Sequence, residues 1–185
     1  MLNNIAALIG GETAAVGDYE SIQTYTIGAG GSASITFSSI PSTYKHLQIR
    51  ALGRTDRAVS LPGLGMRFNS DTASNYSDHS LVGDGASASA GSDVGVSYIF
   101  LARYSGSSAS ANIFGAGIID ILDYANTNKY KTTRNLGGTD LNGSGQVTLQ
   151  SGLWRSTAAI TSIQLYADIS GNLAQYSSFA LYGVK

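Results

Sequence analysis

The stretch RFNSDTASNYSDH, residues 67–79, contains two aspartates, a histidine, two asparagines and several hydroxyl side chains. Asp71, Asp78 and His79 are residue types that bind divalent cations. A calcium loop of the EF-hand type also needs a glycine at its sixth position for a sharp turn. Counted from Asn69 or from Asp71, the sixth residue is a serine or a tyrosine. We therefore predict no metal site, and interpret the stretch as a turn in which Asn and Asp side chains bond to nearby backbone groups.

Asp120 and Asp123 in GIIDILDYANTNKY form a second group of carboxylates that could serve acid–base catalysis. Side chains alternate between the two faces of a strand, so this odd spacing points the two carboxylates to opposite faces. The pattern favours a strand end instead. Asp123 and Asn126 would shape the turn, and Lys129 or Lys131 would return on the next strand.

Other catalytic patterns are also absent from the sequence. A Ser-His-Asp triad would have to use His46 or His79, and His46 is expected on the surface side of the strand HLQIRAL, opposite Leu47. No G-x-S-x-G motif occurs. The glycine-rich IGAGGSAS lies between two predicted strands with no helix after it, so we interpret it as a hairpin turn and not as a phosphate loop. We expect no enzymatic activity and no cofactor.

Aromatic side chains beside loops and strand ends are candidates for recognition. Trp154, the single tryptophan, would stack on a sugar ring or anchor a partner if exposed, and would close one end of a β-sandwich if buried. Tyrosines beside serine and asparagine suit an adaptable binding surface or a subunit interface. The aromatic residues considered are Tyr76, Tyr104, Tyr124, Tyr130, Tyr176 and Trp154.

A period of two runs through most of the chain from Glu20 onward and predicts strands with one buried face. Turn signals such as LPGLG, GSSAS and LNGSG separate eight to ten short strands. We predict an all-β fold, a jelly-roll-like antiparallel β-sandwich, with GDGASASAGSD and GSSASA as exposed loops. The sets expected to share a face are Ala33, Ile35 and Phe37; Leu47, Ile49 and Ala51; Val96, Tyr98 and Phe100; Val147, Leu149, Ser151 and Leu153; and Phe179, Leu181 and Gly183.

The first residues have a different pattern. LNNIAALI places apolar side chains at three- and four-residue spacing, which predicts a short helix that ends at Gly10. A helix this short is marginal alone and needs a docking surface. We expect residues 1–18 to be an attachment arm and residues 19–185 to be the β-sandwich domain. The attachment residues of the arm are Leu2, Ile5, Leu8 and Ile9.

Composition excludes several classes of partner. The net charge is −1 and only 12% of residues are charged, without a basic stripe, so we expect no nucleic-acid binding. No apolar run approaches the roughly 20 residues of a membrane-spanning helix, so we expect no membrane insertion. The absence of cysteine excludes disulfides and thiolate metal sites. So few charges suggest that much of the surface contacts other protein chains.

Several motifs together resemble a group of small virion proteins of tailed bacteriophages, common in aquatic phages. The likeness covers nearly the whole chain and rests on FSSIPSTYKHLQIR (37–50), RFNSDTASNYSDH (67–79), IIDILDYANTNKYKT (118–132), GLWRSTAAITSI (152–163) and FALYGVK (179–185). The resemblance implies a jelly-roll structural protein displayed on the particle and supplies no catalytic residues. In this setting RFN would end a strand, SDTASN would turn and YSDH would begin the next strand.

The resemblance leads to a functional expectation. The protein would be a capsid decoration or head-fibre protein, assembled in the bacterial cytoplasm as a homotrimer and attached to other virion proteins by its arm. An alternative is the receptor-binding tip of a tail fibre or spike, which would bind a host glycan. A glycan depolymerase is the third class, and no acid pair or triad supports it.

Overall fold

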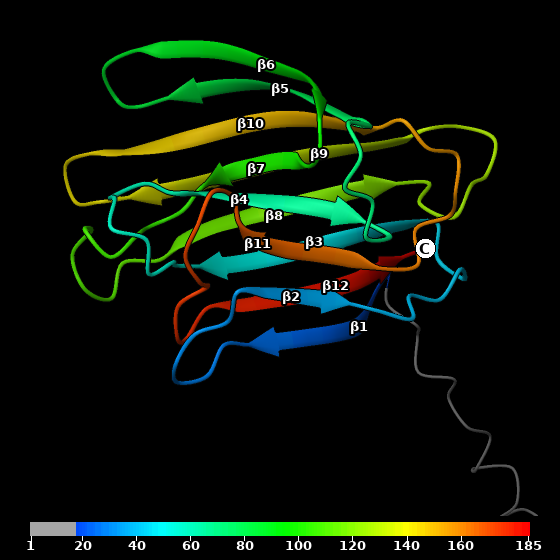
Figure 1. The fold of residues 1–185 in the computed structure, drawn as a ribbon, viewed down its shortest axis with the longest axis horizontal. Coiled ribbons are helices and arrows are strands. Elements are labelled where there is room, and N and C mark those ends of the chain that lie inside the picture. Colours follow the sequence, from blue (N-terminus) through cyan, green and yellow to red (C-terminus); the bar gives the residue numbers. More distant parts are fainter. Residues whose placement is uncertain (1–17) are drawn as a thin grey trace, which may run out of the picture.

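The computed structural model describes residues 18–185, which form twelve β-strands in two antiparallel sheets (Figure 1). The strands are β1 (Tyr19–Thr26), β2 (Ser34–Phe37), β3 (His46–Gly53), β4 (Gly63–Phe68), β5 (Tyr76–Gly83), β6 (Ala88–Val96), β7 (Ile99–Arg103), β8 (Gly115–Leu122), β9 (Lys131–Asp140), β10 (Gly145–Trp154), β11 (Ile163–Ala167) and β12 (Ser178–Val184). Among the described residues, no helix has the length and apolar character to span a membrane. The arm residues Leu2, Ile5, Leu8 and Ile9 lie outside the described part.

The two sheets stack with the core between them, which confirms the all-β, sandwich-like fold. The larger sheet has the order β1-β12-β3-β8-β9-β10-β5-β6, and the smaller has the order β2-β11-β4-β7. Figure 1 shows the smaller sheet lying over the middle of the larger one. The β5–β6 hairpin continues the large sheet beyond β7, the last strand of the small sheet. Part of the large sheet's inner face therefore has no strand packed over it.

Alternation on β3 and β12 matches the expected pattern. Leu47 and Ile49 on β3, and Phe179 and Leu181 on β12, are fully buried. Ile35 and Phe37 on β2 are also buried, while Ala33 before the strand is exposed. Burying a large apolar side chain contributes roughly 1.5–3 kcal/mol, so these strands form the centre of the core.

Strand β10 turns the opposite face inward from the one its sequence suggests. Val147 and Leu149 share a face as expected, but that face is turned to solvent, while Thr148 and Gln150 are buried. The buried polar side chains are used beneath β7: Asn135 of β9 donates to the carbonyl oxygen of Leu101 at 2.5 Å and to Gln150 Oε1 at 3.4 Å. A strip of side-chain hydrogen bonds replaces aliphatic packing there.

Strand β7 differs in the same way. Ile99, Leu101 and Ala102 are its buried residues. Phe100, which was expected on a buried face with Val96 and Tyr98, lies on the opposite side of the strand from Ile99 and Leu101. The main-chain N–H of Phe100 points past the free edge of β7 and donates to Asp78 of β5 at 3.1 Å. The small sheet is tied to the overhanging part of the large sheet by this bond.

Glycines on the inner face of the large sheet allow β7 to lie close to it. A Cβ atom on Gly137 would come within 2.7 Å of the methyl group of Ala102, and one on Gly152 within 2.7 Å of Ile99. Both distances are shorter than side-chain packing tolerates, so residues with side chains would push β7 away.

Two predicted connections are corrected by the structure. IGAGGSAS is not a hairpin turn, because β1 pairs with β12 in the large sheet while β2 pairs with β11 in the small one. It crosses between sheets, with Gly30 and Gly31 at φ values of 90° and 74° that favour glycine. GDGASASAGSD is not a loop throughout, since only its start turns and Ala88–Val96 is the edge strand β6. Both faces of β6 are exposed, so its sequence lacks the alternation of apolar and polar residues that would predict a strand.

Candidate functional site

The motif at residues 67–79 is a structural turn, as expected. Strand β4 ends at Phe68, Asn69 and Ser70 take positive φ values, and β5 begins at Tyr76. Asp71 holds the turn together: its carboxylate accepts hydrogen bonds from Ala73 N, Asn75 Nδ2 and Trp154 Nε1, at 2.9, 3.0 and 2.7 Å. Burial acts to raise the pKa of Asp71, but these hydrogen bonds outweigh it and keep the pKa below its usual value.

Most of the aromatic residues proposed for recognition belong to the core. Tyr76, Tyr104, Tyr124 and Trp154 are at most 2% exposed, so their rings offer no surface to a partner. Trp154 stacks on Tyr76 with ring centroids 6.3 Å apart, which is the buried alternative considered for it. Tyr130 and Tyr176 are exposed. The recognition hypothesis therefore applies only to these two.

The carboxylates Asp120 and Asp123 occupy separate environments. Asp120 lies on the outer face of the large sheet and pairs with Arg134 at 3.0 Å. Asp123 follows the end of β8 and contacts Lys129 and Lys45 in the turn. The structure thus has the predicted strand end.

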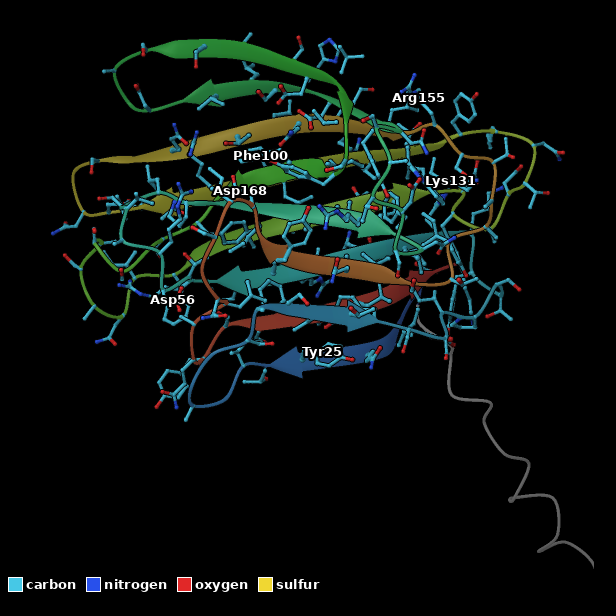
Figure 2. The ribbon with its side chains drawn as sticks, in the orientation of Figure 1. Tyr25, Asp56, Phe100, Lys131, Arg155 and Asp168 are labelled. Carbon is cyan, nitrogen blue, oxygen red and sulfur yellow. The ribbon has the colours of Figure 1, made fainter. Side chains whose placement is uncertain are left out.

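A buried lysine closes the same end of the sandwich. Lys131, at the start of β9, is fully buried, and its ammonium group donates to the carbonyl oxygens of Asn126, Lys129 and Thr157 at 2.7, 2.9 and 3.1 Å. Figure 2 shows Lys131 and Arg155 at this end, with Asp56 at the opposite end. The ammonium group therefore links the turn between β8 and β9 to the loop that follows β10.

Within residues 18–185 no group of three or more His, Cys, Asp or Glu side chains has an arrangement that could hold a metal ion. Asp78 and His79, adjacent in sequence, are separated by strand alternation: Asp78 points into the sandwich and His79 lies on the outer face. The set Asp71, Asp78 and His79 is therefore not brought together.

A polar cleft lies where the β5–β6 hairpin extends past β7. Its cavity volume is about 320 Å³. The floor consists of inner-face residues of β5, β6 and β10, and the wall consists of β7 and Asp168, which follows β11. Figure 2 shows Phe100 and Asp168 close together on this wall. The lining residues are Asp78, Ser80, Val82, Gly91, Ser92, Asp93, Phe100, Arg103, Gln146, Thr148 and Asp168.

The electrostatics of the cleft are set by buried hydrogen-bond acceptors. Asp78 is 5% exposed, and its burial raises the pKa of the carboxyl group against the effect of the Phe100 N–H bond. The side chain of Asp168 is 7% exposed, and its Oδ1 has no hydrogen-bond partner, with Arg57 3.6 Å away. Gln146 Oε1 is also buried without a partner. A cleft of this kind suits a ligand that donates hydrogen bonds.

The outer face of the large sheet carries a continuous apolar band. One cross-strand row joins Ile118, Leu136, Leu149 and Leu81 on four neighbouring strands. These side chains are between 46% and 55% exposed, and Leu52 and Val147 extend the band in the next row. We call these six residues the outer apolar band. Exposed apolar patches of this extent mark interaction surfaces.

Sequence reasoning missed both features. Alternation in YSDHS already places Tyr76, Asp78 and Ser80 on one face, which could have separated Asp78 from His79. Asp93 was assigned to a loop, and Arg103 and Asp168 come from distant segments, so no local signal could join them. Of the outer apolar band, only Val147 and Leu149 belong to a face that the sequence predicts, and that face is expected to be buried, whereas the structure exposes it.

Comparison with known proteins finds no matching family model, no similar curated protein and no similar solved structure.

Proposed function

We propose that the protein is a structural protein of a bacteriophage particle that associates with further copies of itself through the outer apolar band. The observation that carries the self-association is this band of exposed aliphatic side chains on an otherwise regular sheet. The phage setting, the jelly-roll relationship and the threefold number come from the sequence resemblance. Capsid decoration is the proposed role, with the virion as the location.

The occupant of the outer face is proposed to be a second copy of this chain. Eight strands spaced by about 4.8 Å, with about eight residues rising 3.4 Å each, give a face of about 34 by 27 Å. This area, about 900 Å², matches the roughly 800 Å² that each partner contributes to a stable interface. In a threefold assembly, this face would be shared with the two neighbouring copies around the axis.

The charges on the face fit association between identical copies. Arg134 and Asp120 are already paired with one another, and Gln48 donates to the same carboxylate at 2.9 Å. Arg50, also on this face, lies over the ring of Tyr182. The Asp120–Arg134 pair can therefore meet a second copy without leaving either of its charges unpaired. One shallow hollow beside Gly117 and Gly138 adjoins Ile118 and Leu136, and would accept a side chain from a neighbouring subunit.

The proposed role and its two alternatives predict different observations. A decoration protein should be present in many copies, whereas the receptor-binding tip of a tail fibre should be present in few and should bind host cells. A glycan depolymerase should release sugars from host glycans. Quantitative mass spectrometry of purified particles separates the first two classes, and a glycan-release assay tests the third.

Self-association is tested by gel filtration coupled to light scattering. The full chain should elute with a mass of about 57 kDa, three times the 19.1 kDa of one chain. Leu136→Arg places a charge in the centre of the outer apolar band and should shift the mass to that of one chain. Ile169→Arg is the matched control, because Ile169 is 70% exposed but lies outside the large sheet.

The outcomes separate the parts of the proposal. A wild-type mass near 19.1 kDa, or an oligomer that Leu136→Arg leaves intact, would contradict association through this face. A dimer that Leu136→Arg dissociates would support the interface and reject the threefold number.

A further inference from the structure

The polar cleft beside β7 has no part in the proposed self-association, because it opens on the inner face of the large sheet. The cleft exists because β5 and β6 extend past the small sheet. The side chains that these strands turn toward the uncovered space are mostly polar. Asp78 and Ser80 on β5 and Thr148 on β10 stand where apolar side chains line the rest of the sandwich. The inner face of the large sheet therefore becomes polar where the small sheet stops covering it.

The cleft has more hydrogen-bond acceptors than donors. Asp78, Asp93 and Asp168 contribute carboxylates. The buried Oε1 of Gln146 has no partner, and Oδ1 of Asp168 has no hydrogen bond, although it forms an ion pair with Arg57 at 3.6 Å. The side chain of Asp168 is more than nine-tenths buried and lines the cavity. Buried acceptors without partners are uncommon in folded proteins and mark places where a donor binds.

The ligand must therefore bring hydrogen-bond donors and no negative charge. A metal ion does not fit, because the acidic side chains among residues 18–185 do not converge in a group of three. A strongly cationic ligand is disfavoured by the two guanidinium groups nearby, Arg103 in the wall and Arg57 at 3.6 Å from Asp168. Neutral hydroxyl groups remain as donors that need no charge.

The shape of the cleft fits a small ring compound. Its volume of about 320 Å³ lies near the lower end of the range for small-molecule sites, about 300–1,000 Å³. The Phe100 ring gives the wall an apolar surface, with the Arg103 guanidinium 5.7 Å from its centroid. Sugar rings combine hydroxyl donors at their edges with apolar C–H faces. We infer that the cleft between the β5–β6 hairpin and β7 binds a short neutral saccharide, held by Asp168, Gln146 and Asp78 and packed against Phe100.

The inference is tested by NMR on the full chain with four probes, the methyl glycosides of glucose, galactose, mannose and N-acetylglucosamine. At least one should shift the amide signals of Phe100, Ser92 and Gln146, which surround the cleft. This measurement uses the wild-type protein, so it does not depend on whether a variant folds.

Two variants then locate the binding. Asp168→Asn keeps the shape of the side chain and removes its charge, and should weaken the bound glycoside by about tenfold or more, as expected for a lost hydrogen bond to a charged group. Asp123→Asn changes a carboxylate in the turn after β8, which neither lines the cleft nor belongs to the outer apolar band, and should leave the affinity unchanged.

Three results would overturn the inference. The first is that none of the four glycosides shifts the spectrum. The second is that the shifted amides lie away from the cleft, or that Asp168→Asn binds as the wild type does. The third is that spermidine, tested as a cationic amine, shifts the cleft amides while the glycosides do not. None of these results bears on the mass of the oligomer, so the two proposals fail separately.

Discussion

At the scale of single residues, one carboxylate organises the turn that the sequence made conspicuous. Asp71 receives three hydrogen bonds, including one from the indole of Trp154, whose ring is almost completely buried. Aspartate was a candidate metal ligand in the sequence, but its oxygens are occupied by the protein itself. Its chemistry is that of a structural anchor for one end of the sandwich.

Asp71→Asn should lower the free energy of unfolding at neutral pH by about 1–2 kcal/mol, because the amide keeps one acceptor oxygen and its NH2 group cannot accept from the remaining donors. The pKa of Asp71 is depressed in the folded state, so its contribution is present above the ordinary aspartate value and is lost as the pH falls through the folded value. The difference between the two proteins should therefore shrink on acidification below the ordinary value of 3.8.

Trp154 fluorescence reports this unfolding directly, since it is the single tryptophan. Denaturant titrations at neutral and acidic pH measure both proteins. Asp84→Asn is a suitable control, because that carboxylate caps a separate exposed turn at Ala86 and Ser87. An Asp71→Asn protein with unchanged stability at neutral pH would show that the anchor contributes little.

At the scale of elements, the position of β7 depends on glycines in the strands beneath it. Gly137 pairs with Gly117 across β9 and β8. The space over Gly137 on the inner face is filled by Ala102 of β7, and the space over Gly117 by Tyr104, which follows β7. The small sheet can then approach the large one at this edge, and the wall of the cleft is fixed by the same approach.

Gly137→Ala should destabilise the protein by about 1–3 kcal/mol, because the new methyl group overlaps the methyl group of Ala102 and neither can rotate away. Gly83→Ala on β5 is the matched control, since a Cβ atom there meets nothing within 4 Å. Thermal unfolding of the two variants beside the wild type measures the effect. Equal stability of both variants would mean that β7 shifts without cost.

At the scale of the whole molecule, the two strands at one edge of the large sheet are β1 and β12, which bring the beginning and the end of residues 19–184 together. Strand β1 begins at Tyr19, and its partner β12 ends at Val184, so the register of the edge is complete within the domain. The predicted role of residues 1–18 is attachment, and their apolar residues lie before this edge in the sequence.

Deleting residues 1–18 should leave a folded domain whose unfolding temperature changes by less than about 4 °C, the shift that 1 kcal/mol causes in a domain of this size. The truncated protein should no longer join phage particles, because linked weak contacts of several arms would be lost together. Mass spectrometry of particles assembled with each form measures the copies retained. Normal decoration by the truncated form would place the attachment site elsewhere.

The sequence by itself determined the class of fold and the character of its turns. Alternation identified β3 and β12 with their correct faces, because both strands lie in the middle of the sandwich, where one face is apolar and the other polar. Turn-forming residues located the end of β4, the start of β5 and the end of β8. This was possible because Asn and Asp side chains hydrogen-bond to backbone groups only a few residues away.

Only the tertiary structure decided which face of a strand is inside. A period of two shows which side chains share a face, but the buried face is the one that another sheet covers. On β10 the inner face carries Thr148, which lines the cleft, and Gln150, which lies beneath β7, while Leu149 faces outward in the apolar band. The cleft has the same origin, because Asp78 and Asp168 come from segments ninety residues apart and meet where the small sheet ends. Contacts of that range depend on how the sheets stack, which no local pattern records.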